Sequence, residues 1–392
     1  MSAFNKQTVR DLDVGGKRVL VRVDFNVPLI DGEVGDDRRI REALPTIRYL
    51  LDHAASFVLI SHLGRPDGKV VPKYSMAPVA KRLERLLGRP VKLAPDSGAQ
   101  AKVLASALKP GEVLLLENLR FNPGEEANDP DFARALASLG EVYVNDAFGT
   151  AHRAHASTEG VTRYLPAAAG FLMEKELTTL GAVVESPERP AMAIIGGAKV
   201  SSKIAVLRSL LSKVDYVAVG GGMANTFFKA EGLSVGKSLV EDDKLDVARQ
   251  IKAEAGAKLL LPVDAVIAQE IKPNVETKVV PVADVPAGWM ILDVGPKTVE
   301  DFARIAAGCK TVVWNGPIGV YETPPFGEGT KMLADRIASS KARSIVGGGD
   351  LVAALEGSGI AERMGFVSTG GGASLELLEG RTLPGVAALR DK

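Results

Sequence analysis

The sequence is poor in several features that mark particular classes of protein. It has a single cysteine, Cys309, so no disulfide forms within the chain, as is usual in a reducing compartment. Its 48 basic and 48 acidic residues give a net charge of zero, which argues against a nucleic-acid or anionic-membrane partner. No uncharged apolar run approaches the roughly 20 residues of a membrane span, and Met1–Asp13 lacks the apolar core of a secretory signal. We therefore expect a cytoplasmic protein.

The familiar motifs of side-chain catalysis are missing too. The sequence has no H-R-D loop and no spacing typical of zinc ligands. Cys309 has no neighbouring histidine in the sequence, which favours a structural thiol over a nucleophile. Any mechanism must therefore work without an evident catalytic dyad.

The length and the hydrophobic pattern predict an α/β protein of two domains. At 392 residues the chain exceeds what one core usually supports. Strand-like and helix-like patterns alternate, which predicts parallel, doubly wound sheets. The predicted strands are Arg18–Phe25, Phe57–Ser61, Val91–Ala94, Val113–Leu116, Val142–Val144, Ala191–Ile195, Tyr216–Val219, Lys258–Val263, Met290–Val294, Lys310–Trp314, Ser344–Val346 and Phe366–Ser368. The predicted helices are Asp36–His53, Met76–Gly88, Gly98–Leu108, Asp131–Gly140, Val200–Val214, Asp242–Ala257, Thr298–Gly308, Gly327–Ser339 and Leu351–Leu355.

The boundary between the domains is expected between Gly170 and Pro190. Residues 164–170 are compatible with a turn into a helix, Phe171–Val184, that bridges the two halves. Pro187 and Pro190 then end this helix before the next strand.

Polar and basic residues stand just beyond several predicted strands of the first half. Each arginine alone is better explained as a solvated surface residue. Ligands of open α/β sheets, however, bind at the carboxyl ends of the strands, so basic residues after separate strands converge on one edge. His53 and His155 lack this placement and are expected to be structural. The residues at strand ends are Asp24, Asn26, His62, Arg65, Arg120, His152 and Arg153.

The second half carries glycine clusters where strands lead into helices. Glycine lets backbone N–H groups approach phosphates closely. Lys199 and Lys203 follow the first cluster and are expected on the first turn of a helix, where two cations oppose the helix dipole unless an anion lies between them. Asp350 follows another cluster and fits equally a Mg²⁺ ligand or a helix N-cap. The clusters are Gly196–Lys199, Gly220–Gly222, Asn315–Pro317, Gly347–Asp350 and Gly370–Gly372.

Taken together, the motifs resemble those of phosphoglycerate kinases, in order, from about Arg10 to the C-terminus. The resemblance implies two Rossmann-like domains with parallel sheets, each a three-layer αβα sandwich, joined by a hinge helix. Residues 1–170 with 380–392 would bind phosphoglycerate, and residues 171–379 would bind the nucleotide. The motifs are Val21–Pro28, Ser61–Pro66, Glu117–Phe121, Ala151–His155, Gly196–Val200, Gly220–Ala224, Trp314–Pro317 and Gly347–Asp350.

The resemblance also implies a reaction and its residues. A phosphoryl group would pass reversibly from 1,3-bisphosphoglycerate to ADP, with Mg²⁺, in a monomer that closes its domains. Arg39, Lys199, Gly371 and Gly372 would stabilise the moving group, and Asp350 would hold the metal. The phosphoglycerate ligands would be Asp24, Asn26, Arg39, His62, Arg65, Arg120 and Arg153. The nucleotide ligands would be Lys203, Glu322, Gly348, Gly349, Asp350 and Leu351.

This reaction explains the missing dyad. A carboxylate nucleophile, with an ordinary pKa near 4, is already ionised and needs no general base, so positioning and charge stabilisation suffice. Two positions depart from the family pattern. Leu351 replaces a small hydroxyl residue and loses a side-chain contact to phosphate, and Tyr321 replaces a common Phe, which we expect to be harmless.

Two other functions compete with this hypothesis. A Rossmann oxidoreductase requires a G-x-G-x-x-G turn after an early strand, with an acidic residue about 20 positions on, and the sequence lacks this unit. A non-catalytic protein that binds phosphorylated metabolites is compatible with the charges alone. Turnover of ATP with 3-phosphoglycerate separates these possibilities.

Overall fold

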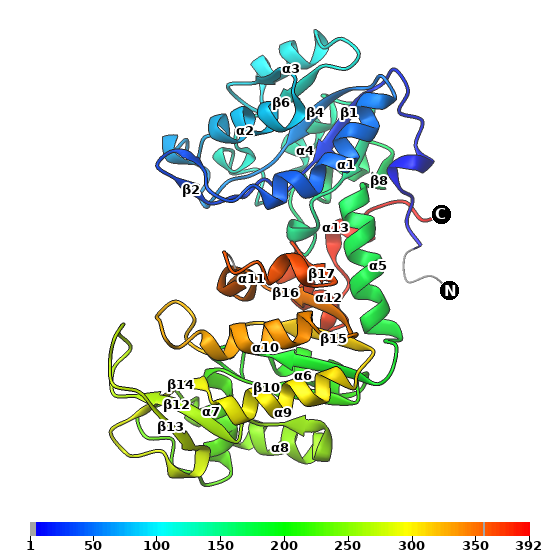
Figure 1. The fold of residues 1–392 in the computed structure, drawn as a ribbon. Helices are drawn as coiled ribbons and strands as arrows, with labels where there is room; N and C mark the ends of the chain where they lie inside the picture. Colours follow the sequence, from blue (N-terminus) through cyan, green and yellow to red (C-terminus); the bar gives the residue numbers. More distant parts are fainter. Residues whose placement is uncertain (1–4, 356) are drawn as a thin grey trace. The chain divides into compact units, whose positions relative to one another are not determined.

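A computed structural model describes residues 5–355 and 357–392. The chain divides into two compact units, coloured along the sequence in Figure 1. Unit 1 comprises the residues up to Thr179 together with Thr382–Lys392, and unit 2 is Leu180–Arg381. The division lies within helix α5 (Phe171–Glu185), inside the interval from Gly170 to Pro190 in which we expected it, and later than residue 170.

Unit 1 is built on a six-stranded parallel sheet with the order β5-β6-β4-β1-β7-β8. Strand β1 lies inside the sheet: β4, β6 and β5 lie on one side of it, and the later strands β7 and β8 lie on the other. Parallel pairing places the carboxyl ends of these strands at one edge. The strands are β1 Arg18–Arg22, β4 Ser56–Ile60, β5 Val91–Leu93, β6 Val113–Leu115, β7 Val142–Asn145 and β8 Ala167–Ala169.

Helices cover this sheet because its strands are apolar on both faces. Val19 and Val21 pack in one buried cluster with Ile40 of α1 and Leu83 of α2, whereas Leu20 between them is equally buried on the opposite face. A two-stranded hairpin of β2 (Leu29–Ile30) and β3 (Glu33–Val34) precedes α1. The helices are α1 Arg38–Asp52, α2 Ala77–Leu87, α3 Ala99–Ser106, α4 Pro130–Ala137 and α13 Pro384–Ala387.

Unit 2 has a second six-stranded parallel sheet, in the order β11-β10-β9-β15-β16-β17. Its strands are β9 Ala191–Ile195, β10 Tyr216–Val219, β11 Leu259–Leu260, β15 Thr311–Asn315, β16 Arg343–Gly347 and β17 Phe366–Val367. Its helices are α6 Ile204–Leu211, α7 Gly222–Ala230, α8 Leu245–Ala255, α9 Pro296–Ala307, α10 Glu328–Ala338, α11 Gly349–Leu355 and α12 Gly372–Leu378. Trp314 is buried at the centre of the cluster that packs α9, α10 and α11 on one face of this sheet. The expected α/β architecture with two parallel sheets is confirmed.

Several local predictions were wrong. The predicted strand Met290–Val294 forms β14, but in a separate antiparallel sheet with β12 (Asp264–Ala268) and β13 (Lys278–Pro281), which the sequence pattern had missed. Ala167–Ala169, expected within a turn, pairs with β7 as strand β8. A short strand of small residues has too weak a hydrophobic pattern to be recognised from sequence. It forms a strand because it pairs with a neighbouring strand in the folded chain.

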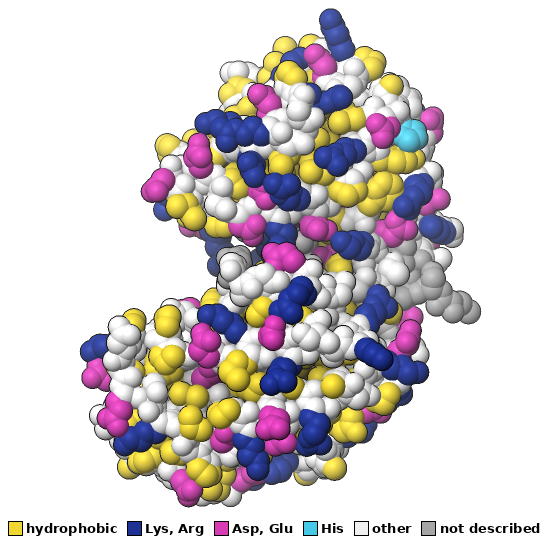
Figure 2. All heavy atoms as spheres, viewed as in Figure 1, with side chains coloured by type: hydrophobic (Ala, Val, Ile, Leu, Met, Phe, Trp, Pro, Cys, Tyr) yellow, Lys and Arg dark blue, Asp and Glu magenta, His cyan; other side chains and the backbone are white. Residues whose placement is uncertain are grey.

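The surface agrees with the balanced composition. Figure 2 shows basic and acidic side chains interspersed over the visible surface of each unit. Within the described part of the chain, no helix is long and apolar enough to cross a membrane.

Candidate functional site

In unit 1 the predicted residues lie beyond the carboxyl ends of neighbouring strands. Asp24 and Asn26 follow β1, and His62 follows β4. Arg120 lies in the short helix Leu119–Phe121 after β6, and Arg153 lies beyond β7. Because β6, β4, β1 and β7 are adjacent, the fold brings these residues to one edge of the sheet.

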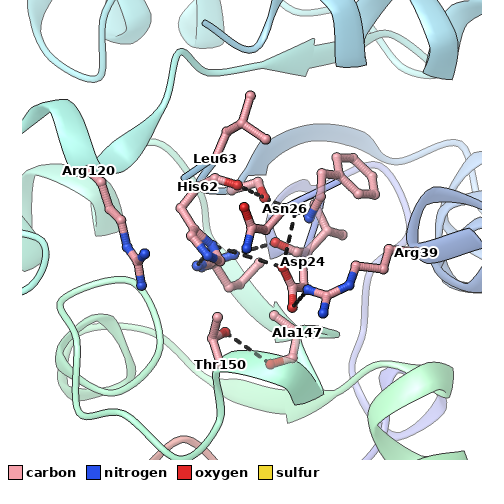
Figure 3. Close-up of polar contacts among 12 residues, drawn as sticks. Asp24, Asn26, Arg39, His62, Leu63, Arg120, Ala147 and Thr150 are labelled. Atoms are coloured by element: carbon pink, nitrogen blue, oxygen red, sulfur yellow. Dashed lines mark hydrogen bonds and ion pairs between the residues drawn. The ribbon is translucent and has the colours of Figure 1, made fainter. Parts of the chain in front are cut away.

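Asp24 is the acidic centre of this group. It is buried, and its Oδ2 accepts a hydrogen bond of 2.6 Å from Nη1 of Arg39 on α1. Figure 3 shows Arg39 directed at Asp24. Burial opposes the ionised form of Asp24, but the guanidinium groups of Arg39 and Arg22 hold its pKa below the ordinary value. The carboxylate therefore stays charged and keeps Arg39, which is one-third exposed, in place.

Asn26 and Arg120 fix the loop after β4 from two sides. The Oδ1 of Asn26 accepts a hydrogen bond from Gly64 N at 2.9 Å, and Arg120 Nη1 donates to Gly64 O at 2.9 Å. Arg120 is itself buried and pairs through Nε with Glu126 at 3.3 Å. Burial lowers the pKa of Arg120. Arg65, next to this loop, is exposed, as is Arg153.

One residue of this site was missed by the sequence analysis. Arg22, the last residue of β1, has no exposed surface and contacts His62, with 3.1 Å between Nη2 and Nδ1. Arg22 belongs to the motif Val21–Pro28, but its position in a predicted strand does not reveal that its guanidinium group is buried. Its side-chain partners His62 and Ser157 come from distant parts of the chain, so only the fold reveals them.

Unit 2 contains a cavity of about 460 Å³ beside its glycine turns. Its wall is mostly apolar, from β14 and the segment after β15, and this lining suits a planar ring. Glu322 and Asp350 supply carboxylates to the lining. Asn225 of α7, which is buried, lies in the same wall and donates from Nδ2 to Leu239 O at 3.2 Å.

The glycines beside the cavity are required by close backbone approach. A Cβ on Gly196 would lie 2.0 Å from Pro317 O, because the ends of β9 and β15 touch there. Gly348 has a φ of +98°, a conformation that residues with a side chain rarely adopt. These turns therefore leave the backbone N–H groups at the start of α11 accessible for an anion.

The expected helical placement of the two lysines was wrong. Helix α6 begins at Ile204, so Lys199 lies in the loop after β9 and Lys203 is the residue preceding the helix. The argument that both occupy one helical face therefore fails. Lys203 instead donates from Nζ to Asn315 Oδ1 at 2.8 Å. Burial lowers the pKa of Lys203, while Glu379 and Asp350 oppose this effect.

Asn315 was noted only as part of a glycine turn, yet it ends β15 and is 3% exposed. Its Oδ1 is taken by Lys203, and its Nδ2 is buried without a partner, facing Gly348. A buried amide donor beside a glycine turn is suited to an anionic oxygen. Gly371 precedes α12 with a φ of +50°, and Gly372 is the first residue of that helix.

Leu351 belongs to the core of unit 2. Its side chain is fully buried and packs in the cluster around Trp314. Cys309 is also buried, its Sγ donates to Ile305 O at 3.3 Å, and burial raises the pKa of its thiol. Both observations indicate structural roles for these side chains.

Known proteins resemble this chain over almost its whole length. The model of the phosphoglycerate kinase family matches residues 9–381. The chain belongs to the phosphoglycerate kinase family. A phosphoglycerate kinase of Moorella thermoacetica is 60% identical over 391 residues, with 99% of this chain and 100% of the relative covered. That of Chloroflexus aurantiacus is 59% identical over 398 residues, with 99% and 100% covered.

Solved structures agree. The phosphoglycerate kinase of Coxiella burnetii is 44% identical with a TM-score of 0.87, and that of Pyrococcus horikoshii is 33% identical with a TM-score of 0.88. Each comparison covers 98% of both chains. The protein is thus a phosphotransferase that moves a phosphoryl group between 1,3-bisphosphoglycerate and ADP, giving 3-phosphoglycerate and ATP. The oxidoreductase and the non-catalytic alternatives are therefore wrong.

Proposed function

We propose that the polar edge of unit 1 binds the phosphoglycerate. Its guanidinium groups match the geometry and charge of phosphate and carboxylate. The ion pair between Arg39 and Asp24 and the two hydrogen bonds to Gly64 support this proposal, because they fix the donors before a ligand arrives. The residues assigned to this site are Asp24, Asn26, Arg39, His62, Arg65, Arg120 and Arg153.

The nucleotide is assigned to the cavity of unit 2. Its apolar wall accepts the base, and Glu322, which lines the same cavity, binds the ribose. Lys203, held by Asn315, and the N–H groups of Gly348, Gly349 and Leu351 serve the phosphates. Because Leu351 is buried, it contributes only its backbone.

Mg²⁺ fits this site as an ion shared with the nucleotide. Among the described residues, no group of three or more His, Cys, Asp and Glu is arranged to hold a metal by itself. Asp350 is exposed at the start of α11 and offers one carboxylate, and Mg²⁺ is commonly bound by one or two carboxylates plus substrate phosphates. When bound, the ion neutralises phosphate charge.

Transfer of the phosphoryl group needs no general base, since the acceptor carboxylate is ionised at neutral pH. Arg39 from unit 1, and Lys199 with the N–H groups of Gly371 and Gly372 from unit 2, stabilise the charge on the moving group. This set is drawn from both units, so we propose that domain closure completes it. We further propose that the enzyme acts as a cytoplasmic monomer.

Separate binding of the two ligands tests the assignment. Arg120→Ala should raise the Kd for 3-phosphoglycerate about 10-fold or more, the effect of losing a charged hydrogen bond. The Kd for ADP should change by less than about twofold. Lys203→Ala should show the opposite pattern. Calorimetric titration of each variant with each ligand measures both. Equal weakening of the two ligands by either variant would show that the sites are assigned wrongly.

A further inference from the structure

Arg22 is a permanently charged group enclosed by protein. It has no exposed surface, and burial of an unpaired guanidinium is costly. Its Nε donates to Ser157 Oγ at 2.8 Å, its Nη1 donates to Val23 O, and its Nη2 contacts Nδ1 of His62 at 3.1 Å. None of these three partners is a carboxylate, so these contacts do not form an ion pair. They must serve another purpose than charge neutralisation.

The contact with Arg22 determines where the proton of His62 resides. A guanidinium has only donors, so Nδ1 of His62 must accept, and the ring proton lies on Nε2. Burial lowers the pKa of His62 well below its ordinary value. Arg22, Arg120 and Arg39 lower it further, whereas the charge of Asp24 opposes them. His62 is therefore neutral at physiological pH.

The other tautomer has a ready partner. Nδ1 of His62 lies 4.0 Å from Oδ1 of Asp24. Without Arg22 at Nδ1, a proton on this nitrogen would be attracted to the Asp24 carboxylate. Nε2 would then present a lone pair, which repels an anionic oxygen. The choice of tautomer thus decides whether the ring attracts or repels an anion.

Ser157 and Glu125 hold Arg22 in its position. The Oγ of Ser157 accepts from Arg22 and donates to Glu125 Oε1 at 2.6 Å, while Ser157 N donates to Glu125 Oε2 at 3.0 Å. The carbonyl of Ser157 accepts from the Tyr143 hydroxyl at 2.6 Å. Ser157 and Glu125 are completely buried. The hydroxyl therefore bridges the guanidinium to the buried carboxylate of Glu125, in place of a direct pair that would draw Arg22 away from His62.

We propose that Arg22, Ser157 and Glu125 are positioning residues that keep His62 in its Nε2–H tautomer, so that the ring offers phosphoglycerate a neutral hydrogen-bond donor. The proposal rests on the substrate role of His62 assigned above. It gives Ser157 a function that its distance along the chain from His62 does not suggest. It also explains why the buried arginine bonds to a hydroxyl and an imidazole.

The tautomer is measured directly by ¹⁵N NMR of the histidine rings in the full-length enzyme. His62→Gln identifies the His62 signals among those of the four histidines. We expect the wild type to show an unprotonated, hydrogen-bonded Nδ1 and a protonated Nε2. A protonated Nδ1 in the wild type would overturn the proposal, whatever the variants do.

Ser157→Ala tests the link, and Ser157→Thr restores the hydroxyl. Ser138→Ala is the matched control, because Ser138 is exposed and its hydroxyl donates to the local carbonyl of Ala135 at the end of α4. In Ser157→Ala we expect a mixture of His62 tautomers and a KM for 3-phosphoglycerate raised about 10-fold, as for one lost hydrogen bond to a charged group. The KM for ATP and kcat should change less than about twofold. Ser157→Thr and Ser138→Ala should resemble the wild type.

The outcomes separate the proposal from the assignment on which it rests. A raised KM with an unchanged tautomer would show that Ser157 is merely structural, and an unchanged KM with a changed tautomer would show that the tautomer is irrelevant. If the His62 signals do not shift when 3-phosphoglycerate is added to the wild type, the substrate role of His62 is wrong, even where the tautomer is as expected. Should Ser157→Ala not fold, the wild-type tautomer and Ser157→Thr still decide.

Discussion

The Nη1 of Arg39 donates a 2.6 Å hydrogen bond to Oδ2 of the buried Asp24. Arg39 starts from helix α1 and Asp24 from the end of strand β1, so the pair joins the two elements at the polar edge of unit 1. Arg39 is thereby oriented before a ligand binds. Preorganised charge of this kind is the main source of catalysis in phosphoryl transfer.

Asp24→Asn should release Arg39 while preserving the shape of the side chain. The loss of one charged hydrogen bond predicts a KM for 3-phosphoglycerate raised about 10-fold. The KM for ATP should stay within about twofold, because the cavity that we assign to it lies in the other unit. Steady-state kinetics with each substrate varied in turn measures both constants, and a parallel rise in the two would contradict a local effect.

Lys199→Ala should lower kcat by about 10²–10³, the usual effect of removing one donor that stabilises transition-state charge. ADP affinity should change little, because Lys203 and the glycine turns remain. Lys341→Ala, at an exposed position outside the site, is the control. Near-normal turnover of purified Lys199→Ala would remove this residue from the mechanism.

Leu351→Ser should destabilise unit 2, although it restores the small hydroxyl residue common in the family. Leu351 is fully buried in the same core cluster as Trp314, and truncation of a buried leucine costs about 2–5 kcal/mol. Urea unfolding followed by tryptophan fluorescence reports on this unit, because both tryptophans, Trp289 and Trp314, lie within it. Leu351→Met should cost less than about 1.5 kcal/mol, and equal losses in the two variants would refute a cavity effect.

Asp146→Asn should remove a pH dependence of stability. Burial raises the pKa of Asp146 to about 7, above the ordinary 3.8, so its contribution to stability is complete below pH 3.8 and lost as pH rises to about 7. Asparagine cannot ionise, and its oxygen can still accept from Leu172 N and Met173 N at the start of α5. The variant should therefore gain up to about 4 kcal/mol relative to wild type between pH 4 and 7.

Urea unfolding followed by circular dichroism at several pH values measures this gain. Asp31→Asn is a suitable control, since Asp31 is an exposed residue with a φ of +51° in the β2–β3 turn, a conformation that asparagine also accepts. A difference between Asp146→Asn and wild type that stays constant from pH 4 to 7 would mean that the pKa of Asp146 is not raised in the folded protein.

Closure of the two units should require both ligands. Arg39 belongs to unit 1, whereas Lys199 and Gly371 belong to unit 2, so neither unit carries the full set proposed for catalysis. Small-angle scattering should give a smaller radius of gyration with both ligands than with either one alone or none. An unchanged radius in all four states of an active preparation would contradict closure.

Much of the fold was predictable from the sequence, because long apolar strands and amphipathic helices such as α1 carry their own periodicity. The antiparallel sheet of β12, β13 and β14 was not predictable, since a strand pattern does not specify its partners. The loop position of Lys199 was also missed. The glycine turn was expected to lead directly into the helix, but α6 begins only at Ile204.

The sequence by itself determined the family, the alternation of strands and helices, and which polar residues end strands, because these properties are local or depend only on motif order. The tertiary structure alone decided which groups are buried together. Arg22, His62, Ser157 and Glu125 are far apart in the chain, and only the pairing of β1 with β4 and β7 brings them into contact. Burial and contact set the charge and the tautomer of such groups, so their chemistry depends on the folded chain.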